Sequence, residues 1–253
     1  MWNDLAPVLP EACRQMERAE ADPVGEADDA RVKAWAELAG TPAFQAIASD
    51  AISAAAIVAD DVVVDLGAGT GLLALRAAGT AERVIAVDRS AAMLAHLRAS
   101  ADQREMVNID TITADIRSLP LADECASVVV SNYAFHHLDH AGKQLALTEA
   151  RRILQPGGRL VIADMMFGLS LRDRDRHIIA SKIVAIGRRG PAGLWRIARN
   201  GALIATGRWE HPEPPEAWRR MLEQRRFENV DVSLLAHESG VACARRPARA
   251  TPG

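Results

Sequence analysis

Five short runs rich in β-branched residues alternate with alanine- and leucine-rich stretches of helical length from Asp61 onward. The runs are VVVDL (62–66), RVIAVD (83–88), IDTITAD (109–115), ASVVVSN (126–132) and GRLVIAD (158–164). This alternation is typical of a parallel sheet covered by helices on both faces, and right-handed crossovers leave a doubly wound sheet as the main topology. Two further runs in residues 230–246 predict an antiparallel hairpin turning at Glu238-Ser239-Gly240. We therefore expect an α/β fold with a doubly wound, mostly parallel seven-stranded sheet and a terminal antiparallel hairpin.

Helical segments are expected before and within this framework. Residues 1–57 predict several short N-terminal helices that would form a lid, one of them with Thr41 as its N-cap and Pro42 at its first position. Residues 58–253 would form the main domain, and residues 168–226 within it predict a helical insert before the hairpin, on the substrate side. The breaker sequence Gln155-Pro156-Gly157-Gly158 is expected to end the helix before the fifth strand.

Length and charge limit the other possibilities. A chain of 253 residues suits one large domain, and no apolar stretch approaches the roughly 20 residues of a membrane span. The acidic start lacks an apolar secretory core and the three cysteines form no CxxC pair, so we expect a cytoplasmic protein. Residues 171–227 hold 13 Lys or Arg against 6 Asp or Glu, although the net charge is −3. This basic insert fits either an acidic substrate or a solvated helical face.

The sequence DLGAGTG places a glycine-rich turn between the first strand and the next helix. Such a turn offers free backbone N–H groups and a positive helix end to a ligand. The spacing of Gly67, Gly69 and Gly71 is GxGxG, and Leu72 stands where a dinucleotide fingerprint requires its third glycine. Asp65 just before the turn would repel a pyrophosphate and attract an ammonium or sulfonium group. The charge pattern therefore favours a cationic cofactor.

Two further carboxylates follow strands of the same sheet. Asp88 ends the second strand, where a carboxylate can accept both hydroxyls of a ribose. Asp115 follows the third strand, where it can accept a hydrogen bond from the exocyclic amine of adenine. Either carboxylate could instead cap the helix that follows it. Their occurrence at consecutive strand ends beside the glycine turn favours the binding role.

In the order DLGAGTG, AVDRS, ADIRSLPLADECASVVVSNYAFHHL and ARRILQPGGRLVIAD, the chain resembles the class I S-adenosylmethionine-dependent methyltransferases of the small-molecule type. The resemblance covers roughly residues 57–167 and the terminal hairpin. It implies S-adenosylmethionine as the cofactor. The residues that it places at the cofactor are Asp65, Gly67, Ala68, Gly69, Asp88, Arg89, Asp115, Ile116 and Asn132.

The resemblance also implies a role for each of these residues. Gly67, Ala68 and Gly69 would pass the methionine end of the cofactor, and Asp65 would lie near its amino group. Asp88 would hold the ribose.

The adenine and the methyl group would contact a second set. Arg89 would lie against the adenine ring, and Asp115 with the backbone of Ile116 would contact its edge. Asn132, after the fourth strand, would line the methyl-donor pocket.

Methyl transfer from a sulfonium needs mainly alignment, and a base is needed only if the acceptor must lose a proton. The candidate catalytic residues are Tyr133, the only tyrosine of the chain, and His136 and His137. Adjacent histidines point in different directions, so we expect at most one to face the substrate, and either could instead be a packed structural residue. We expect no metal, because His140 and the two histidines lack a carboxylate or cysteine partner at matching spacing.

The acceptor is expected to be a small organic molecule, with aromatic, quinone-like and secondary-metabolite compounds as candidates. Nucleic acid is not expected, because the chain has SNYAF in place of an Asn/Asp-Pro-Pro-aromatic motif and lacks a broad basic footprint. Trp195 and Trp209 with arginines in the insert would suit an apolar acceptor bearing an anionic group, and contact with a membrane surface is a less favoured reading. Two functions of other classes stay open: a nicotinamide-dependent oxidoreductase and a non-catalytic S-adenosylmethionine-binding protein. The acceptor atom and the oligomeric state are not predicted.

Overall fold

A computed structural model describes residues 29–168, 211–235 and 239–249 of the chain. Its centre is a seven-stranded sheet of order β3-β2-β1-β4-β5-β7-β6. The first five strands are parallel to one another, and β7 pairs antiparallel with both β5 and β6. The strands are β1 (Val62–Leu66), β2 (Arg83–Asp88), β3 (Ile109–Thr113), β4 (Ala126–Asn132), β5 (Leu154–Met165), β6 (Glu228–Leu234) and β7 (Ser239–Arg245). The predicted α/β fold, with its mostly parallel sheet and antiparallel hairpin, is confirmed.

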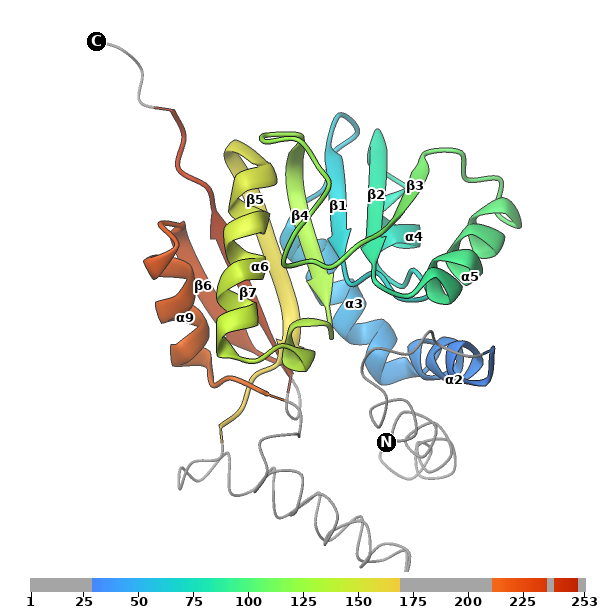
Figure 1. The fold of residues 1–253 in the computed structure, drawn as a ribbon, viewed down its shortest axis with the longest axis horizontal. Coiled ribbons are helices and arrows are strands. Elements are labelled where there is room, and N and C mark those ends of the chain that lie inside the picture. Colours follow the sequence, from blue (N-terminus) through green and yellow to red (C-terminus); the bar gives the residue numbers. More distant parts are fainter. Residues whose placement is uncertain (1–28, 169–210, 236–238, 250–253) are drawn as a thin grey trace, which may run out of the picture.

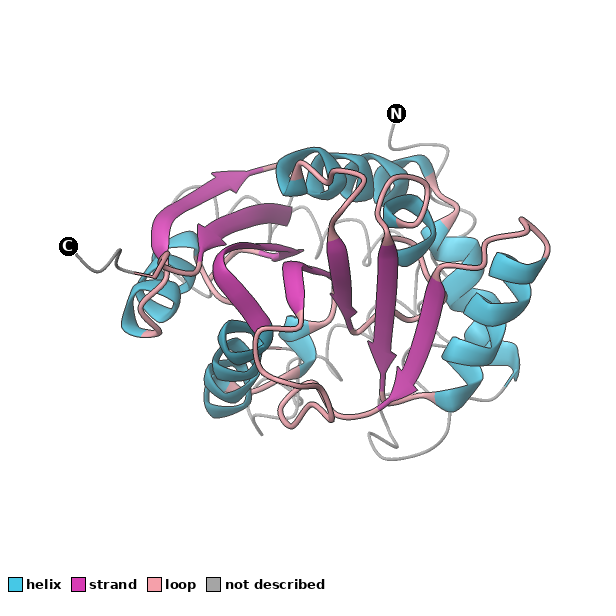
Figure 2. Cartoon of the chain, turned by 90° about the horizontal axis from the view of Figure 1, so that it is seen from above, coloured by secondary structure: helices cyan, strands magenta, loops and turns pink. Residues whose placement is uncertain are grey.

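Helices cover both faces of the sheet (Figures 1 and 2). They are α2 (Asp29–Ala39), α3 (Pro42–Ala55), α4 (Ala74–Ala77), α5 (Ala91–Asp102), α6 (His140–Ile153) and α9 (Pro215–Gln224), with a 3-10 turn η1 (Phe135–His137). Alternate residues of β1 serve the two faces. Val64 and Leu66 belong to the apolar cluster that includes α6 and α9, whereas Val63 belongs to the cluster that includes α3, α4 and α5. Two buried layers of side chains therefore hold the sheet.

From β1 the chain adds β2 and β3 on one side of the sheet and then β4 and β5 on the other, so the order switches between β1 and β4. In open α/β sheets this is the switch point, where a ligand binds outside the carboxyl ends of the strands. The register aligns these ends, because Leu66 pairs with Val87 and Asp88 pairs with Thr113. The glycine turn and the predicted strand-end carboxylates therefore lie at one edge of the sheet, which in Figure 1 is the lower edge, near α2.

Part of the predicted N-terminal lid is described as α2 and α3. Helix α3 begins at Pro42 as predicted, but Thr41 does not cap it with its side chain. The Thr41 hydroxyl instead donates to the carbonyl of Leu38 at 2.7 Å, closing the tight bend between the two helices. A threonine hydroxyl before a helix can either accept from an N–H of that helix or donate to a carbonyl of the preceding helix. Helix α3 packs alanines 48, 51 and 55 into the core, so this part of residues 1–57 belongs to the helical layer of the sheet.

Two turn assignments were wrong in detail. Ser239 and Gly240 are paired with Met165 and Asp164 inside β7, so the hairpin turn precedes them. Helix α6 ends at Ile153, before the QPGG sequence, and residues 155–158 bulge within β5 between the pairs Ala126–Leu154 and Val128–Arg159. Glycine is suited to this bulge, because Gly157 adopts a φ of 81°, which other residues rarely adopt.

The predicted insert lies mostly outside the described residues. Its last part, α9, packs Trp218 into the core beside the sheet, so residues 215–224 complete a helical layer. Residues 169–210 of the predicted insert, with Trp195, Trp209 and most of its basic residues, lie outside the described residues. Within the described ranges, no helix combines the length and apolar character that a membrane crossing requires.

Candidate active site

The glycine turn after β1 leaves open space above one of its residues. Gly67, Gly69 and Gly71 have φ values of 73°, 52° and 94°, a region that residues other than glycine rarely adopt. A Cβ on Gly67 would collide with the side chain of Ala134, so this glycine permits close packing against the turn after β4. A Cβ on Gly69 would meet no atom within 4 Å. The turn is therefore tightly packed at Gly67 and open at Gly69. We call this open part of the turn the cradle, because a ligand could lie against its backbone.

Asp88 ties this turn to the end of β2. Its Oδ2 accepts the backbone N–H of Gly69 at 2.8 Å, and its Oδ1 accepts the N–H of Ser90 at 2.8 Å. Desolvation raises the pKa of Asp88, against the effect of these donors and of the positive charges of Arg89 and Arg31. Arg31 belongs to α2, so the N-terminal helix lies close enough to influence this carboxylate.

Two buried oxygens in the same region have no hydrogen-bond partner. They are Oδ2 of Asp65 and Oδ1 of Asn132, at the ends of β1 and β4. Burial raises the pKa of Asp65 to about 7, and the nearby carboxylate of Asp88 adds to this effect. A buried carboxylate with an unsatisfied oxygen is costly without a donor or a cation. Both atoms therefore fit a ligand that brings a positively charged donor to the cradle.

The third strand-end carboxylate is already engaged. Asp115 accepts from the Nε of Arg117 at 2.9 Å and from its Nη2 at 2.5 Å, and this pairing lowers the pKa of Asp115. The neighbouring Ile116 side chain is buried. Arg89 is exposed, and its charge acts on both Asp88 and Asp115. Arg89 is therefore close enough to influence both carboxylates, and Asp115 would have to share its oxygens with Arg117 to contact a ligand.

Tyr133 lies at the turn where β4 ends. Its φ of 52° bends the chain into η1, and its hydroxyl lies 2.5 Å from the Oγ of Ser239 at the start of β7. Its ring lies 4.9 Å from that of Phe44 in α3. With its hydroxyl held by Ser239, Tyr133 is better suited to form an aromatic wall than to take a proton.

The two adjacent histidines have different environments. His136 is buried, and its Nδ1 lies 2.7 Å from Oδ1 of Asp164. His137 is exposed, and its pKa is lowered well below the usual range by desolvation and by the charges of His136, Arg89 and Arg31. The structure therefore separates the two candidates into a buried histidine bound to a carboxylate and an exposed one.

Sequence reasoning missed two residues of this region. Asp164 ends β5 in GRLVIAD just as Asp88 ends β2 in RVIAVD, and the same strand-end rule would have found it. Phe44 carries no local signal, because only the fold brings α3 beside Tyr133.

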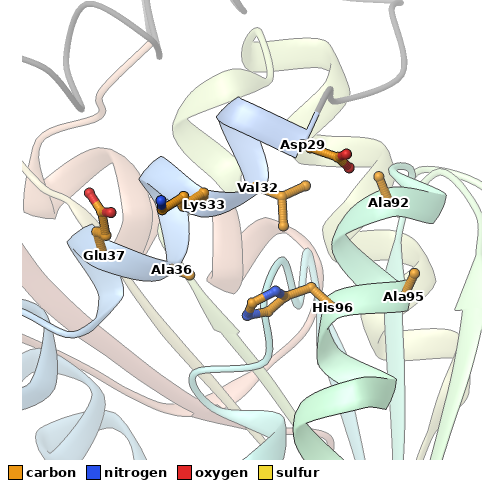
Figure 3. Close-up of a pocket in the computed structure, with 8 residues that line it drawn as sticks. All are labelled: Asp29, Val32, Lys33, Ala36, Glu37, Ala92, Ala95 and His96. Carbon is orange, nitrogen blue, oxygen red and sulfur yellow. The ribbon is translucent and has the colours of Figure 1, made fainter.

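A groove of about 800 Å³ lies between α2 and α5. Figure 3 shows Val32 and His96 pointing into the space between these helices. The lining residues are Asp29, Val32, Lys33, Ala36, Glu37, Ala92, Ala95 and His96, and they include none of the predicted site residues.

The sheet order and its switch point are those of a doubly wound α/β fold, a class that often binds nucleotides at this edge. Residues 63–158 match a family model described as a methyltransferase domain. A crystal structure of an S-adenosylmethionine-dependent methyltransferase from Aquifex aeolicus is similar in fold, with a TM-score of 0.60 and 16% identity over 86% of this chain and 98% of that one. The family match supports the resemblance to methyltransferases over residues 63–158, and the solved structure shares the fold.

Curated relatives match part of the chain. The uncharacterized protein YafE of Escherichia coli is 42% identical over 90 residues, which are 36% of this chain and 42% of YafE. The arsenite methyltransferase of Halobacterium salinarum is 33% identical over 115 residues, 44% of this chain and 29% of that protein. The chain therefore matches less than half the length of these two relatives.

Proposed function

We propose that the protein transfers a methyl group from S-adenosylmethionine to a small organic acceptor. The observation that carries this proposal is the open space at Gly69, in a domain that matches a methyltransferase model and that holds the unpartnered buried oxygens of Asp65 and Asn132 at the same strand ends. When bound, the cofactor would supply an electrophilic methyl group on a sulfonium. Gly69 and Asp65 would hold its amino-acid end, and Asp88 its ribose. Arg89, Asp115 and Ile116 would hold the adenine.

The acceptor side is proposed to lie beside η1. Tyr133 and Phe44 contribute aromatic rings there, and Met165 and Phe167 form an apolar cluster against Tyr133. These side chains favour an apolar or aromatic acceptor over a highly charged one. Helix α2, whose Arg31 acts on Asp88, would form part of the lid expected from residues 1–57.

Turnover tests the proposal directly. The full chain would be incubated with S-adenosylmethionine and a panel of phenols, catechols, hydroquinones and aliphatic alcohols, and release of S-adenosylhomocysteine would be measured. We expect turnover with at least one aromatic member. Asp88→Asn should lower it about 10- to 100-fold at subsaturating cofactor, because a charge-assisted hydrogen bond is weakened.

Asp110→Ala is the matched control. Asp110 pairs with Arg83 in an exposed ion pair near the opposite ends of the strands, so its loss should leave turnover unchanged. Cofactor binding without turnover on any acceptor would contradict catalysis and favour a non-catalytic binding protein.

A further inference from the structure

The end of β5 carries a buried carboxylate to which the sequence assigned no role. The side chain of Asp164 is fully buried. Its Oδ1 lies 2.7 Å from Nδ1 of His136 and accepts the N–H of Met165 at 2.7 Å, while its Oδ2 accepts the backbone N–H of His136 at 3.1 Å. A buried carboxylate persists only when donors compensate its desolvation. Two of these three donors belong to His136.

This contact fixes the protonation pattern of His136. An ionised carboxylate can only accept hydrogen bonds, so the proton of the neutral ring lies on Nδ1 and the lone pair on Nε2. When the ring gains a second proton, the adjacent carboxylate compensates the positive charge of the imidazolium. The pair therefore favours proton uptake at Nε2 of a histidine that would otherwise resist charging in a buried position.

We propose that Asp164 is a positioning residue that holds His136 as the general base toward an acceptor with a dissociable proton. This inference rests on the proposed methyl transfer. In the step, Nε2 takes the proton of the acceptor O–H or N–H group, the acceptor atom forms its bond to the methyl carbon, and the carbon–sulfur bond breaks. S-adenosylhomocysteine leaves, and the imidazolium later releases its proton to water.

Other titratable groups lie near this pair. The His137 ring in η1 lies 4.0 Å from that of His136, and the Tyr133 ring at the end of β4 lies 5.7 Å away. Lys143 of α6 is buried, binds the carbonyls of Leu138 and His211, and feels the charge of Asp164. Glu213 lies 4.0 Å from the Lys143 amine. Positive charge on His137 or Lys143 would oppose proton uptake by His136, which makes the contribution of Asp164 necessary.

The experiment compares wild type with Asp164→Asn in the full chain. The asparagine preserves the shape but carries no charge and can donate to Nδ1, which permits the other tautomer. Asp139→Asn is the matched control, because Asp139 is the exposed N-cap of α6 and asparagine caps a helix equally well. Long-range proton–nitrogen NMR of histidine-labelled protein with S-adenosylhomocysteine, assigned with His136→Gln, would give the tautomer and the pKa of His136. We expect the Nδ1–H tautomer in wild type and a lower pKa in Asp164→Asn only.

Turnover of two phenols distinguishes a positioning role of Asp164 from a role in the stability of the fold alone. At alkaline pH 4-nitrophenol is already ionised and needs no base, whereas phenol does. We expect Asp164→Asn to lower kcat/KM for phenol about 100-fold or more and for 4-nitrophenol less than tenfold, and to remove the rise of the phenol rate with pH. Equal losses on both phenols, or an Nε2–H tautomer in wild type, would overturn the inference. If wild type binds the cofactor product but methylates neither phenol, the phenolic acceptor class fails, and the NMR pKa comparison alone decides whether Asp164 acts on His136.

Discussion

At the scale of single residues, Asp65 links cofactor affinity to pH. Its pKa of about 7 means that the carboxyl is largely protonated at pH 6 and largely ionised at pH 8. Only the ionised form attracts a cationic amino group strongly, so affinity for S-adenosylhomocysteine should rise as pH increases from 6 to 7.5, by up to about tenfold per unit. Calorimetric titration at several pH values measures this, and Asp65→Asn should bind weakly with little pH dependence. Equal pH dependence in both proteins would contradict the assignment.

The same carboxyl should cost stability when the cofactor is absent. A raised pKa in the folded state means that the contribution of Asp65 to the unfolding free energy is present below its ordinary pKa of 3.8 and is lost as pH rises through about 7. We therefore expect Asp65→Asn to melt at a higher temperature than wild type at pH 8, and the difference to shrink toward acid pH. A lower melting temperature of the variant at pH 8 would show that the ionised carboxylate stabilises the fold.

Gly67 and Gly69 should respond differently to the same substitution. Both have positive φ, which costs alanine about 1 kcal/mol or more. Gly67→Ala would also drive a Cβ into Ala134, so it should lower the melting temperature markedly. Gly69→Ala meets open space and should remain folded but bind S-adenosylhomocysteine at least tenfold more weakly. Thermal melts and calorimetry of the two variants check this, and unchanged binding by Gly69→Ala would contradict a ligand above the turn.

At the scale of elements, α9 supports the turn that carries the histidines. Trp218 of α9 is 1% exposed, and its ring meets that of Phe135 in η1 edge-on at 5.6 Å. Trp218→Ala should destabilise the protein by about 3–5 kcal/mol, because it empties a large buried volume. Leu145→Ala on the exposed face of α6 is the control and should change stability by less than about 0.5 kcal/mol. Denaturant unfolding measures both, and similar losses would contradict the packing described.

The strands could be predicted where a β-branched run is followed by a polar residue suited to a strand end. All five parallel strands and the hairpin strands follow from β-branched runs, and Asp88 stands at the end of β2 as expected. The hairpin turn was misplaced because Ser239 and Gly240 have turn-forming identities but pair with β5. Residues 215–224 were predicted only as part of a helical insert, whereas α9 begins at Pro215 and packs Trp218 into the core. The burial of Trp218 depends on tertiary packing that the sequence does not specify locally.

At the scale of the whole molecule, the sheet gathers residues from distant parts of the chain at one edge. The glycine turn, Asp88 and Asn132 could be predicted to meet, because parallel strands share their carboxyl ends. The contact of Asp164 with His136 could not, since it depends on how η1 folds back over β5. The pairing of Asp115 with Arg117 and of Tyr133 with Ser239 likewise depends on side-chain geometry that no spacing rule contains. The cofactor side was thus more predictable than the acceptor side.

We propose that this edge of the sheet binds the cofactor through the cradle at Gly69 and Asp88. Calorimetric titration of the full chain with S-adenosylmethionine, S-adenosylhomocysteine and NADH tests it most directly, with Asp88→Asn and Asp110→Ala measured alongside. We predict that wild type and Asp110→Ala bind both adenosyl compounds and not NADH, and that Asp88→Asn binds them about 10- to 100-fold more weakly. Binding of NADH alone, or adenosyl binding that is unchanged in Asp88→Asn, would contradict the account.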